Sequence, residues 1–312
     1  MIIANPIYDV VFKRMMENEK VAKFFIGTLL EQTIETIAVK PQEYTYEGEF
    51  EDNDPKKYEI IEERIKKRYN IWVYRMDFIA TIKTTTGELK KVLIEIQKAK
   101  NEIDLMRFRN YLAEQYKKED IVDGAKVELP ITTIYILGFK LSGVEIPCLK
   151  VIRSYIDPTN NTSLNTKSDF VEKLTHDSYI VQVERITDRY QTKLDKLLSI
   201  FEQSNFVDDD KITKEFTHIV DFEDMKLTTD LLHYSGTNPE EKKKIAMEQE
   251  AWRTVDALTG NLRDKVAQQN IALAEKNQVI LEKDKALTES NQAIIALQKE
   301  MEELKKKISK EN

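Results

Sequence analysis

The chain has 312 residues, with 48 Lys and Arg against 55 Asp and Glu, and its formal net charge is −7. Hydrophobic residues make up 41% of it, enough for a folded core, while eight Gly and seven Pro exclude a collagen-like or Gly/Pro-rich low-complexity chain. No run approaches the roughly 18 apolar residues of a membrane span, and the first residues lack the features of a secretory signal. The single cysteine, Cys148, cannot form an internal disulfide, so we expect a cytoplasmic protein.

The first part of the chain predicts two helices and a strand. Apolar side chains recur with helical spacing over residues 8–16, directly after Asn5-Pro6. The apolar run 21–30 predicts a second, buried helix, and residues 34–39 predict a strand. The acidic stretch 47–54 is too polar to pack and predicts a loop.

Residues 71–97 predict a β-hairpin. Residues 71–82 are rich in β-branched and aromatic side chains, and residues 91–97 form a second run of this kind. The short segment 84–88 between them contains Gly87 and predicts the turn.

Helices and strands continue to alternate after the hairpin. Residues 103–117 and 194–201 have helical spacing, and residues 157–168 predict a polar loop. Further strands are expected at 131–139, 149–156 and 179–183. Because the strands mix with helices and include a hairpin, we predict an α/β fold with a mixed sheet.

The chain divides near residue 238. Residues 239–312 contain 14 basic and 14 acidic residues, so the first 238 residues carry the whole charge of −7. Asn238-Pro239 followed by two glutamates is a typical helix start. We therefore predict an α/β domain over residues 1–238 and a long helix over residues 239–312.

The C-terminal helix has a heptad repeat. The repeated apolar residues are Val266, Leu273, Ile280, Leu287, Ile294, Met301 and Ile308. The second row of the seam is mostly polar, and buried Asn in that row favours a defined register and a two-stranded state. We predict a parallel coiled-coil homodimer; the alternative is a solvated single helix with an amphipathic stripe.

The most informative residues for chemistry lie in the hairpin. Asp77 interrupts one apolar strand, and Glu95 and Gln97 interrupt the other. A carboxylate in so apolar a strand is costly to bury without a partner, and Mg²⁺ is a suitable partner because it prefers carboxylate and water oxygens. A metal held by Asp77 and Glu95 would activate a water and stabilise charge on a phosphate. The alternative is a solvent-facing strand whose polar face carries Glu95 and Gln97.

This set of residues resembles the PD-(D/E)xK nuclease core, in which an Asp and a Glu bind metal and a Lys two residues later orients or activates water. A closer resemblance is to the PD-(D/E)xK family of transposases and recombination-promoting nucleases, and it covers about residues 5–120. The matching segments are Asn5-Pro6-x-Tyr8-Asp9-x-x-Phe12-Lys13, Met76-Asp77-Phe78, Ile94-Glu95-Ile96-Gln97 and Arg107-x-x-x-Tyr111. The resemblance implies a restriction-endonuclease-like mixed sheet flanked by helices. It also implies a bacterial DNA endonuclease that depends on Mg²⁺ or Mn²⁺ and acts in recombination or in mobile elements.

The chain departs from the family pattern at Gln97, which stands where Lys is expected. A Gln side chain can hydrogen-bond a water or a phosphate oxygen, but it carries no charge and cannot act as a proton carrier at neutral pH. Three residues are accessory candidates. Asp9 is either a further carboxylate or a helix cap, and Arg107 and Tyr111 share a helix face that either meets phosphate or is structural.

Basic residues flank the carboxylate strands and suit a surface that follows the phosphates of DNA. The DNA-binding candidates are Lys66, Lys67, Arg68, Arg75, Lys98, Lys100 and Arg109. The alternative is a solvated helix face whose cations pair with neighbouring glutamates.

The sequence and the resemblance together predict a homodimeric, metal-dependent DNA endonuclease in which Asp77, Glu95 and Gln97 are catalytic. The alternative function is a catalytically weak or inactive nuclease fold that binds DNA or a protein partner. Gln97 and the acidic overall charge favour this alternative.

Overall fold

The computed structural model describes residues 1–41, 78–97, 102–122, 124–207 and 211–254, together with the helical residues 273, 276–278, 280, 283–285, 287, 291 and 301. The predicted loop at 47–54 and the first part of the predicted strand 71–82 lie outside these residues. Contacts divide the chain into two units, Met1–Trp252 and Arg253–Asn312. The first unit therefore extends beyond the predicted boundary at residue 238.

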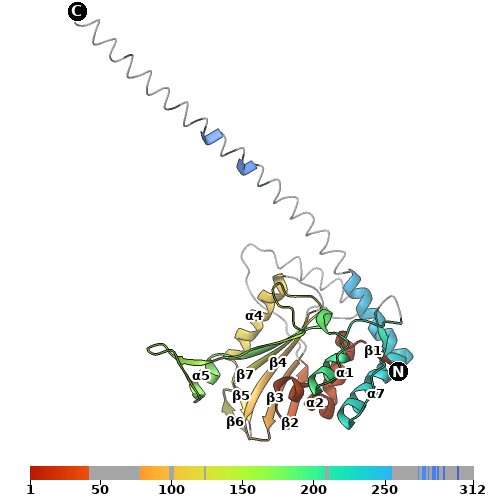
Figure 1. Ribbon diagram of the computed structural model, residues 1–312. Coiled ribbons are helices and arrows are strands. Elements are labelled where there is room, and N and C mark those ends of the chain that lie inside the picture. The colour runs from red at the N-terminus through yellow and green to blue at the C-terminus, as the bar shows by residue number, and fades with distance from the viewer. Residues whose placement is uncertain are drawn as a thin grey trace, which may run out of the picture. The chain divides into compact units, whose positions relative to one another are not determined.

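A six-stranded mixed sheet forms the centre of the first unit (Figure 1). Its strands in spatial order are β2 (Ile34–Pro41), β3 (Phe78–Thr84), β4 (Leu89–Gln97), β7 (Ile131–Leu137), β11 (Asp177–Gln182) and β8 (Cys148–Val151). β3 is antiparallel to both its neighbours, β2 and β4. β7 is parallel to both β4 and β11, and β8 is antiparallel to β11. The predicted α/β class and mixed sheet are confirmed.

Helices cover both faces of this sheet. On one face, Phe78 of β3 and Ile94 of β4 belong to a large hydrophobic core. Four helices contribute to this core: α1 (Asp9–Glu17), α2 (Glu19–Leu30), α6 (Lys193–Ser199) and α7 (Glu223–Thr237). On the opposite face, Leu93 packs with residues of α4 (Glu102–Lys117). Because strand side chains alternate, residues next to each other on β4 face different helix layers.

The predicted hairpin is confirmed for its described part. The turn between β3 and β4 closes through a hydrogen bond from the Thr84 amide to the Glu88 carbonyl at 2.9 Å. Gly87 adopts a positive φ of 84° in this turn, a conformation that glycine takes without steric cost.

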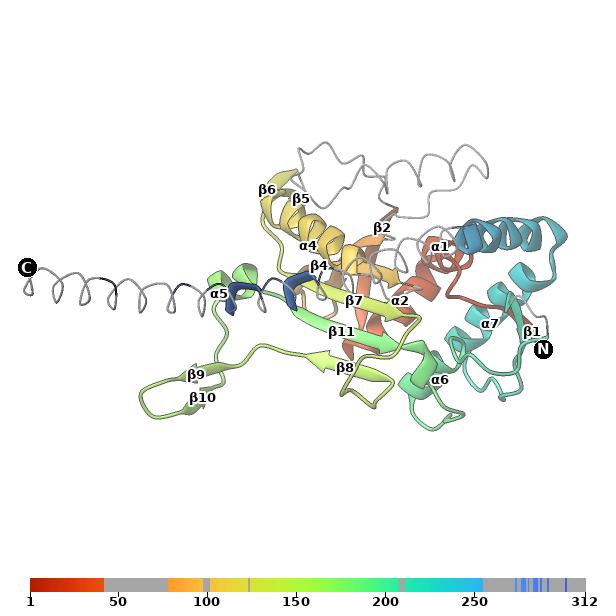
Figure 2. The same ribbon diagram turned by 90° about the horizontal axis from the view of Figure 1, so that it is seen from above.

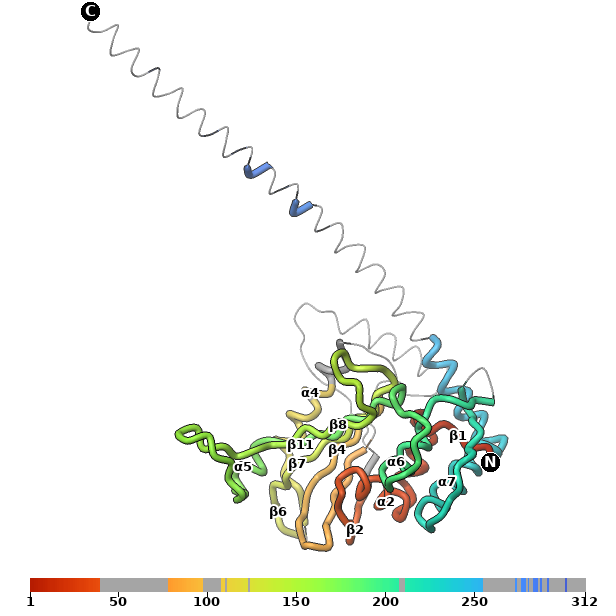
Figure 3. Tube along the Cα trace, in the orientation of Figure 1, coloured from red at the N-terminus to blue at the C-terminus, as the bar shows by residue number. Residues whose placement is uncertain are grey.

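The strand predicted at 149–156 is confirmed at both ends but broken at residues 152–154, and the loop predicted at 157–168 contains a short strand. The chain leaves the sheet after β8 and forms a separate hairpin of β9 (Tyr155–Asp157) and β10 (Thr162–Leu164), then returns through α5 (Asp169–Leu174) to β11 (Figure 3). Between β8 and β9, the backbone amide of Arg153 donates to the Asp177 carboxylate at 2.9 Å, outside any strand pairing. This contact ends β8 within an otherwise β-forming run.

Two further pairs of short strands complete the unit. β1 (Ile2–Ala4) pairs with β12 (Thr213–Glu215), and β5 (Asp120–Val122) pairs with β6 (Ala125–Val127). A 3₁₀ turn, Val183–Arg185, follows β11. Within the described part of the chain, every helix is too short or too polar to cross a membrane.

The helix predicted to begin at Asn238 is confirmed over residues 239–254. The Asn238 side chain accepts hydrogen bonds from the amides of Glu240 and Glu241 at 3.0 and 3.1 Å, as an N-cap does. In the second unit, the described apolar heptad residues are Leu273, Ile280, Leu287 and Met301. They are helical and each is more than half exposed. The pairing of this helix with a second copy stays a prediction.

Candidate functional site

Glu95 is a buried carboxylate on the central strand β4. It shows 3% exposure and follows Leu93 and Ile94, both fully buried. Strand alternation places Glu95 on the face with Leu93, which is the face covered by α4. The strand forms because its near-continuous apolar run suits a position between two other strands.

Tyr135 is the neighbour of Glu95 across the sheet, because the parallel register of β4 and β7 pairs these two residues. Its ring meets that of Phe108 on α4 edge to face, with centroids 4.5 Å apart. Burial, and in smaller measure the negative charge of Glu95, raise the pKa of Tyr135 well above its ordinary value, although a hydrogen bond with Thr133 acts against the shift. Tyr135 therefore remains a neutral phenol beside the carboxylate.

Gln97 ends β4 at the carboxyl edge of three parallel strands. It pairs with Leu137 of β7, which in turn pairs with Gln182 of β11. The amide of Gly138 donates to the Gln97 carbonyl at 2.7 Å, and the Gln97 side chain is half-buried. In open α/β sheets, ligands bind outside this edge.

A buried glutamine organises the loop 138–147 at the same edge. Gln182 accepts a hydrogen bond from the Leu141 amide at 2.6 Å and donates to the carbonyls of Val144 and Ile146 at 3.1 and 2.8 Å. These contacts fix a loop that carries Lys140 as an exposed cation. Neither Tyr135 nor Gln182 was singled out from the sequence, although a polar residue inside or ending an apolar strand is a usable signal for both.

The accessory candidates lie on two different helix layers. Tyr111 is buried on α4, in the cluster that contains Leu93, and Arg107 belongs to the same helix. Asp9 begins α1, whose buried residues pack on the opposite sheet face. Tyr111 therefore lies in the helix layer that covers the sheet face of Glu95, whereas Asp9 lies in the helix layer on the opposite face.

Asn5, the first residue of the predicted motif, has a structural role. Its side chain donates to Gln203 Oε1 at 3.2 Å and to the Lys211 carbonyl at 3.0 Å, and accepts from the Ile7 amide at 3.2 Å. These bonds fix the chain as it enters α1.

Several predicted site residues lie outside the described part of the chain. These are Asp77, Lys66, Lys67, Arg68, Arg75, Lys98 and Lys100. Arg109 is described and is exposed on α4. Among the residues that the structure describes, no three His, Cys, Asp or Glu side chains gather as a group that could hold a metal ion.

Comparison with known protein families, with curated proteins and with solved structures finds no match for this chain.

Proposed function

We propose that the chain is a metal-dependent DNA endonuclease whose active site is built around Glu95. The observation that carries the proposal is the burial of this carboxylate on the central strand β4. Glu95 lies near the carboxyl ends of the parallel strands, where ligands bind in open α/β sheets. A buried carboxylate needs hydrogen-bonding, ionic or metal partners, and a metal ion would be one of the partners of Glu95.

The second carboxylate of the proposed site is Asp77. In the antiparallel register of β3 and β4, Phe78 lies opposite Ile94. Asp77 precedes Phe78 in the sequence, and Glu95 follows Ile94. This pairing supports the proposal that the two carboxylates act together.

Carboxylate oxygens fit Mg²⁺ or Mn²⁺, and Mg²⁺ commonly takes one or two carboxylates from a protein. When bound, such an ion lowers the pKa of its water and stabilises the charge that develops on a phosphate. Asp77 and Glu95 would hold the ion. Tyr135, as a neutral phenol, adds no competing negative charge beside Glu95.

Gln97 has the proposed role of orienting the attacking water. Its side-chain oxygen can accept a hydrogen bond from that water, and its side-chain NH₂ can donate to a phosphate oxygen. It cannot take up the proton of the water. The resemblance to the PD-(D/E)xK family supports this arrangement in motif order, with Gln97 in place of the expected Lys.

The proposed partners are DNA and a second copy of the chain. Lys140, beyond β7, is an exposed cation that can contact phosphates, and Arg109 is exposed on α4. The exposed apolar heptad residues of the C-terminal helix, such as Ile280 and Leu287, support a coiled-coil homodimer. Such pairing would hold two nuclease domains together.

The second candidate function is a DNA- or protein-binding module that retains a nuclease-like fold without turnover. The uncharged Gln97 favours it, because no general acid or base follows Glu95 on this strand.

Nicking of supercoiled plasmid DNA in Mg²⁺, Mn²⁺ or EDTA separates the two functions. We expect nicking in either metal, none in EDTA, and loss of nicking in Asp77→Asn and Glu95→Gln. Glu88→Gln is the matched control, because Glu88 is an exposed glutamate in the turn before β4. Plasmid binding without nicking in any metal would favour the binding module, and nicking that survives in both carboxylate variants would contradict the proposed site.

A further inference from the structure

The loop between β7 and β8, residues 138–147, lies at the carboxyl edge of the parallel strands, and we call it the edge loop. In Figure 2 the carboxyl ends of β7 and β11 lie side by side, and the edge loop runs from the end of β7 to the start of β8. Its first residue, Gly138, donates its amide to the Gln97 carbonyl at 2.7 Å, so the loop begins beside the last residue of β4. Because ligands bind outside this edge in open α/β sheets, the edge loop borders the proposed substrate space.

Two side chains that follow β7 in space hold the edge loop in place. Gln182, the fully buried end of β11, bonds three backbone groups of the loop, and its amide also donates to the Pro147 carbonyl at 2.8 Å. Arg185 donates to the Leu141 carbonyl at 3.3 Å and forms an ion pair with Glu145. The loop is therefore preformed, and a preformed loop loses less conformational entropy when a ligand binds.

The tip of the edge loop exposes one cation and several hydrogen-bond donors. Lys140, Ser142 and Gly143 are exposed, and Lys140 pairs with no carboxylate among the residues that the structure describes. Among the same residues, the amides of Ser142 and Gly143 have no acceptor. Gly143 has a φ of 76°, and no described atom beyond its chain neighbours lies within 4 Å of the position that a Cβ would take. Ammonium, hydroxyl and backbone amide groups are the donors that contact phosphates in protein–DNA complexes.

The charge of the edge loop also favours an anionic partner. Its one acidic side chain, Glu145, is paired with Arg185, whereas Lys140 is its one basic side chain. The loop and Arg185 together have two basic groups and one acidic group, a net positive charge on a domain that is acidic as a whole. Phosphate is attracted to such a place and repelled by most of the remaining surface.

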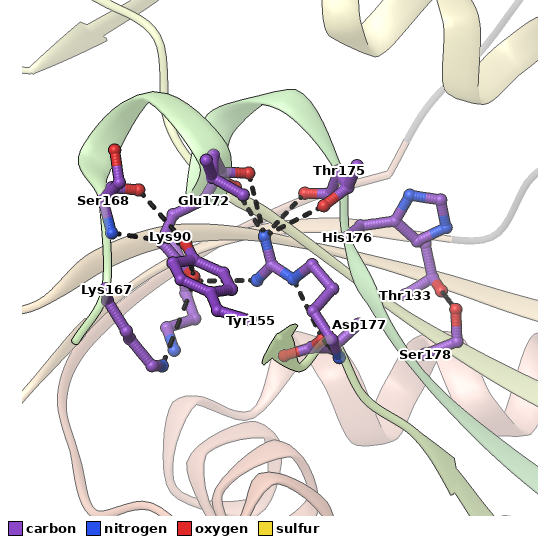
Figure 4. A network of polar contacts seen from close by, with 12 residues as sticks. Lys90, Thr133, Tyr155, Lys167, Ser168, Glu172, Thr175, His176, Asp177 and Ser178 are labelled. Atoms are coloured by element: carbon purple, nitrogen blue, oxygen red, sulfur yellow. Dashed lines mark hydrogen bonds and ion pairs between the residues drawn. The ribbon is translucent and has the colours of Figure 1, made fainter. Parts of the chain in front are cut away.

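The opposite, amino edge of the same strands differs from the carboxyl edge. Polar side chains also gather there (Figure 4), but they satisfy one another. Arg153 pairs with Glu172 and Asp177 at 2.8 and 3.0 Å, and Lys90 pairs with Glu88 at 3.1 Å. Phosphate binding gains from cations that are free to replace counterions. Arg153 and Lys90 are therefore less suited to hold phosphate than Lys140.

We propose that the edge loop is a preformed contact for the phosphate backbone of DNA, with Lys140 and the tip amides as the binding groups. Gln182 and Arg185 are positioning residues, because they act through the loop. The identity of the ligand rests on the proposed function, in which DNA is the substrate. Lys140 is two residues beyond Gly138, so their Cα atoms are at most about 7 Å apart. A phosphate held by Lys140 would thus lie near the end of β4 that carries Gln97.

Equilibrium binding of a fluorescently labelled DNA duplex to the full chain in EDTA tests this inference, because removing the metal prevents cleavage in the proposed mechanism. The affinity is measured between about 50 and 200 mM NaCl, and the slope of log affinity against log salt reports the number of phosphate contacts. Lys140→Met removes the proposed cation. Lys226→Met is the matched control, because Lys226 is an exposed lysine on α7.

We expect Lys140→Met to reduce the magnitude of the slope by about 0.9, the loss of one phosphate contact, and Lys226→Met to leave it unchanged. Lys140 is exposed, so the circular dichroism of the variant should equal that of the wild type. A slope in Lys140→Met equal to that of the wild type would overturn the inference, as would a wild-type chain that binds no duplex.

A double-mutant cycle tests the positioning role of Gln182. We expect Gln182→Met to weaken DNA binding by roughly tenfold, because the loop must then be ordered on binding. The loss should be smaller when Lys140→Met is already present, since both changes act on the same contact. Thr229→Val, which removes a buried hydrogen bond within α7, controls for a general loss of stability. Equal losses in both backgrounds would overturn the positioning role, and Arg185→Met provides the same test if Gln182→Met does not fold.

The outcome is separable from that of the nicking assay. The expected change of slope without nicking in any metal would contradict the endonuclease and leave the edge loop as the DNA contact of a binding module. Metal-dependent nicking by a chain whose slope is unaffected by Lys140→Met would contradict the edge loop alone.

Discussion

Glu95 and Tyr135 lie opposite each other on the parallel strands β4 and β7, and the ring of Tyr135 contacts that of Phe108 edge to face. Burial is the main cause of the raised pKa of Tyr135, and the negative charge of Glu95 adds to it. Glu95 is predicted from the sequence alone, whereas the position of Tyr135 beside it follows from the strand register. It puts a neutral phenol beside one of the two carboxylates of the proposed site.

Replacing Gln97 tests its proposed role with water. We expect Gln97→Ala to lower the single-turnover rate of plasmid nicking by roughly 100-fold, the cost of losing one positioned hydrogen-bonding group in an active site. The Mg²⁺ affinity should change little, because Gln97 is not a proposed ligand. A nicking rate equal to that of the wild type would show that water is oriented by another residue.

Glu248 links the helix that follows Asn238 to α1. Its carboxylate oxygens accept hydrogen bonds from the amides of Asp9 and Val10 at 2.9 and 3.0 Å, at the positive end of α1. We expect Glu248→Ala to lower the free energy of unfolding by about 2 kcal/mol, as for lost hydrogen bonds to a charged group. Urea denaturation of the full chain measures this change.

The contact of Glu248 with α1 also predicts how stability depends on where the chain is truncated. A chain ending at Trp252 keeps Glu248 and the buried residues Ile245 and Ala251, whereas a chain ending at residue 238 loses them. The longer chain should unfold at a higher urea concentration than the shorter one. Equal midpoints would show that residues 239–252 do not stabilise the first unit.

Lys214 should make stability depend on pH in the alkaline range. It is buried, and its ammonium donates to the carbonyls of Ser199 and Glu202 at 2.8 and 2.6 Å, after α6. Burial, opposed in part by Glu202, lowers the pKa of Lys214 from 10.5 to about 8. Between these values the unfolded chain binds more protons at this site than the folded chain, so the contribution of Lys214 to stability rises with pH.

Comparison of the wild type with Lys214→Met isolates this effect. From about pH 7 to pH 10.5, the difference in free energy of unfolding should shift in favour of the wild type by up to about 3 kcal/mol. Urea denaturation at several pH values measures it. A difference that is constant across this range would contradict the lowered pKa.

Lys91 and Asp120 form a buried ion pair at 2.7 Å that joins β4 to the β5–β6 hairpin. We expect Lys91→Met to lower the free energy of unfolding by about 3 kcal/mol, because it leaves a carboxylate without its cation. The double variant Lys91→Met with Asp120→Leu should recover much of this loss. Additive losses in the double-mutant cycle would show that the two residues are not coupled.

Local patterns predicted the elements whose own residues determine them. The helical spacing before Met16, the buried helix after Val21 and the hairpin at Gly87 were read from the sequence, because capping, apolar periodicity and turn geometry act over a few residues. The long apolar run at residues 149–156 was read wrongly as one strand. Arg153 lies in its middle, and its partners Glu172 and Asp177 are distant in the sequence, so no local pattern reveals the break.

The proposed site was predictable to the extent that it depends on alternation within a strand. Glu95 and Gln97 were found because they interrupt apolar residues. Tyr135 and Gln182 were not, because their proximity depends on the order β4-β7-β11, which is set by long-range pairing. The close approach of Gly236 to the Ala4 backbone, where an added Cβ would lie 2.7 Å from the amide nitrogen, is likewise determined by distant packing.

Isothermal titration of Mn²⁺ into the full chain, followed by Glu95→Gln and the control Glu88→Gln, tests the central claim most directly. Because residues that hydrogen-bond to a metal ligand are worth about 10–100-fold in metal affinity, loss of a direct ligand should weaken binding by at least roughly 100-fold. We predict one Mn²⁺ site per chain in the wild type and in Glu88→Gln, and its loss in Glu95→Gln. A wild-type chain that binds no Mn²⁺, or a Glu95→Gln variant that binds it as tightly as the wild type, would contradict a metal-dependent site at Glu95.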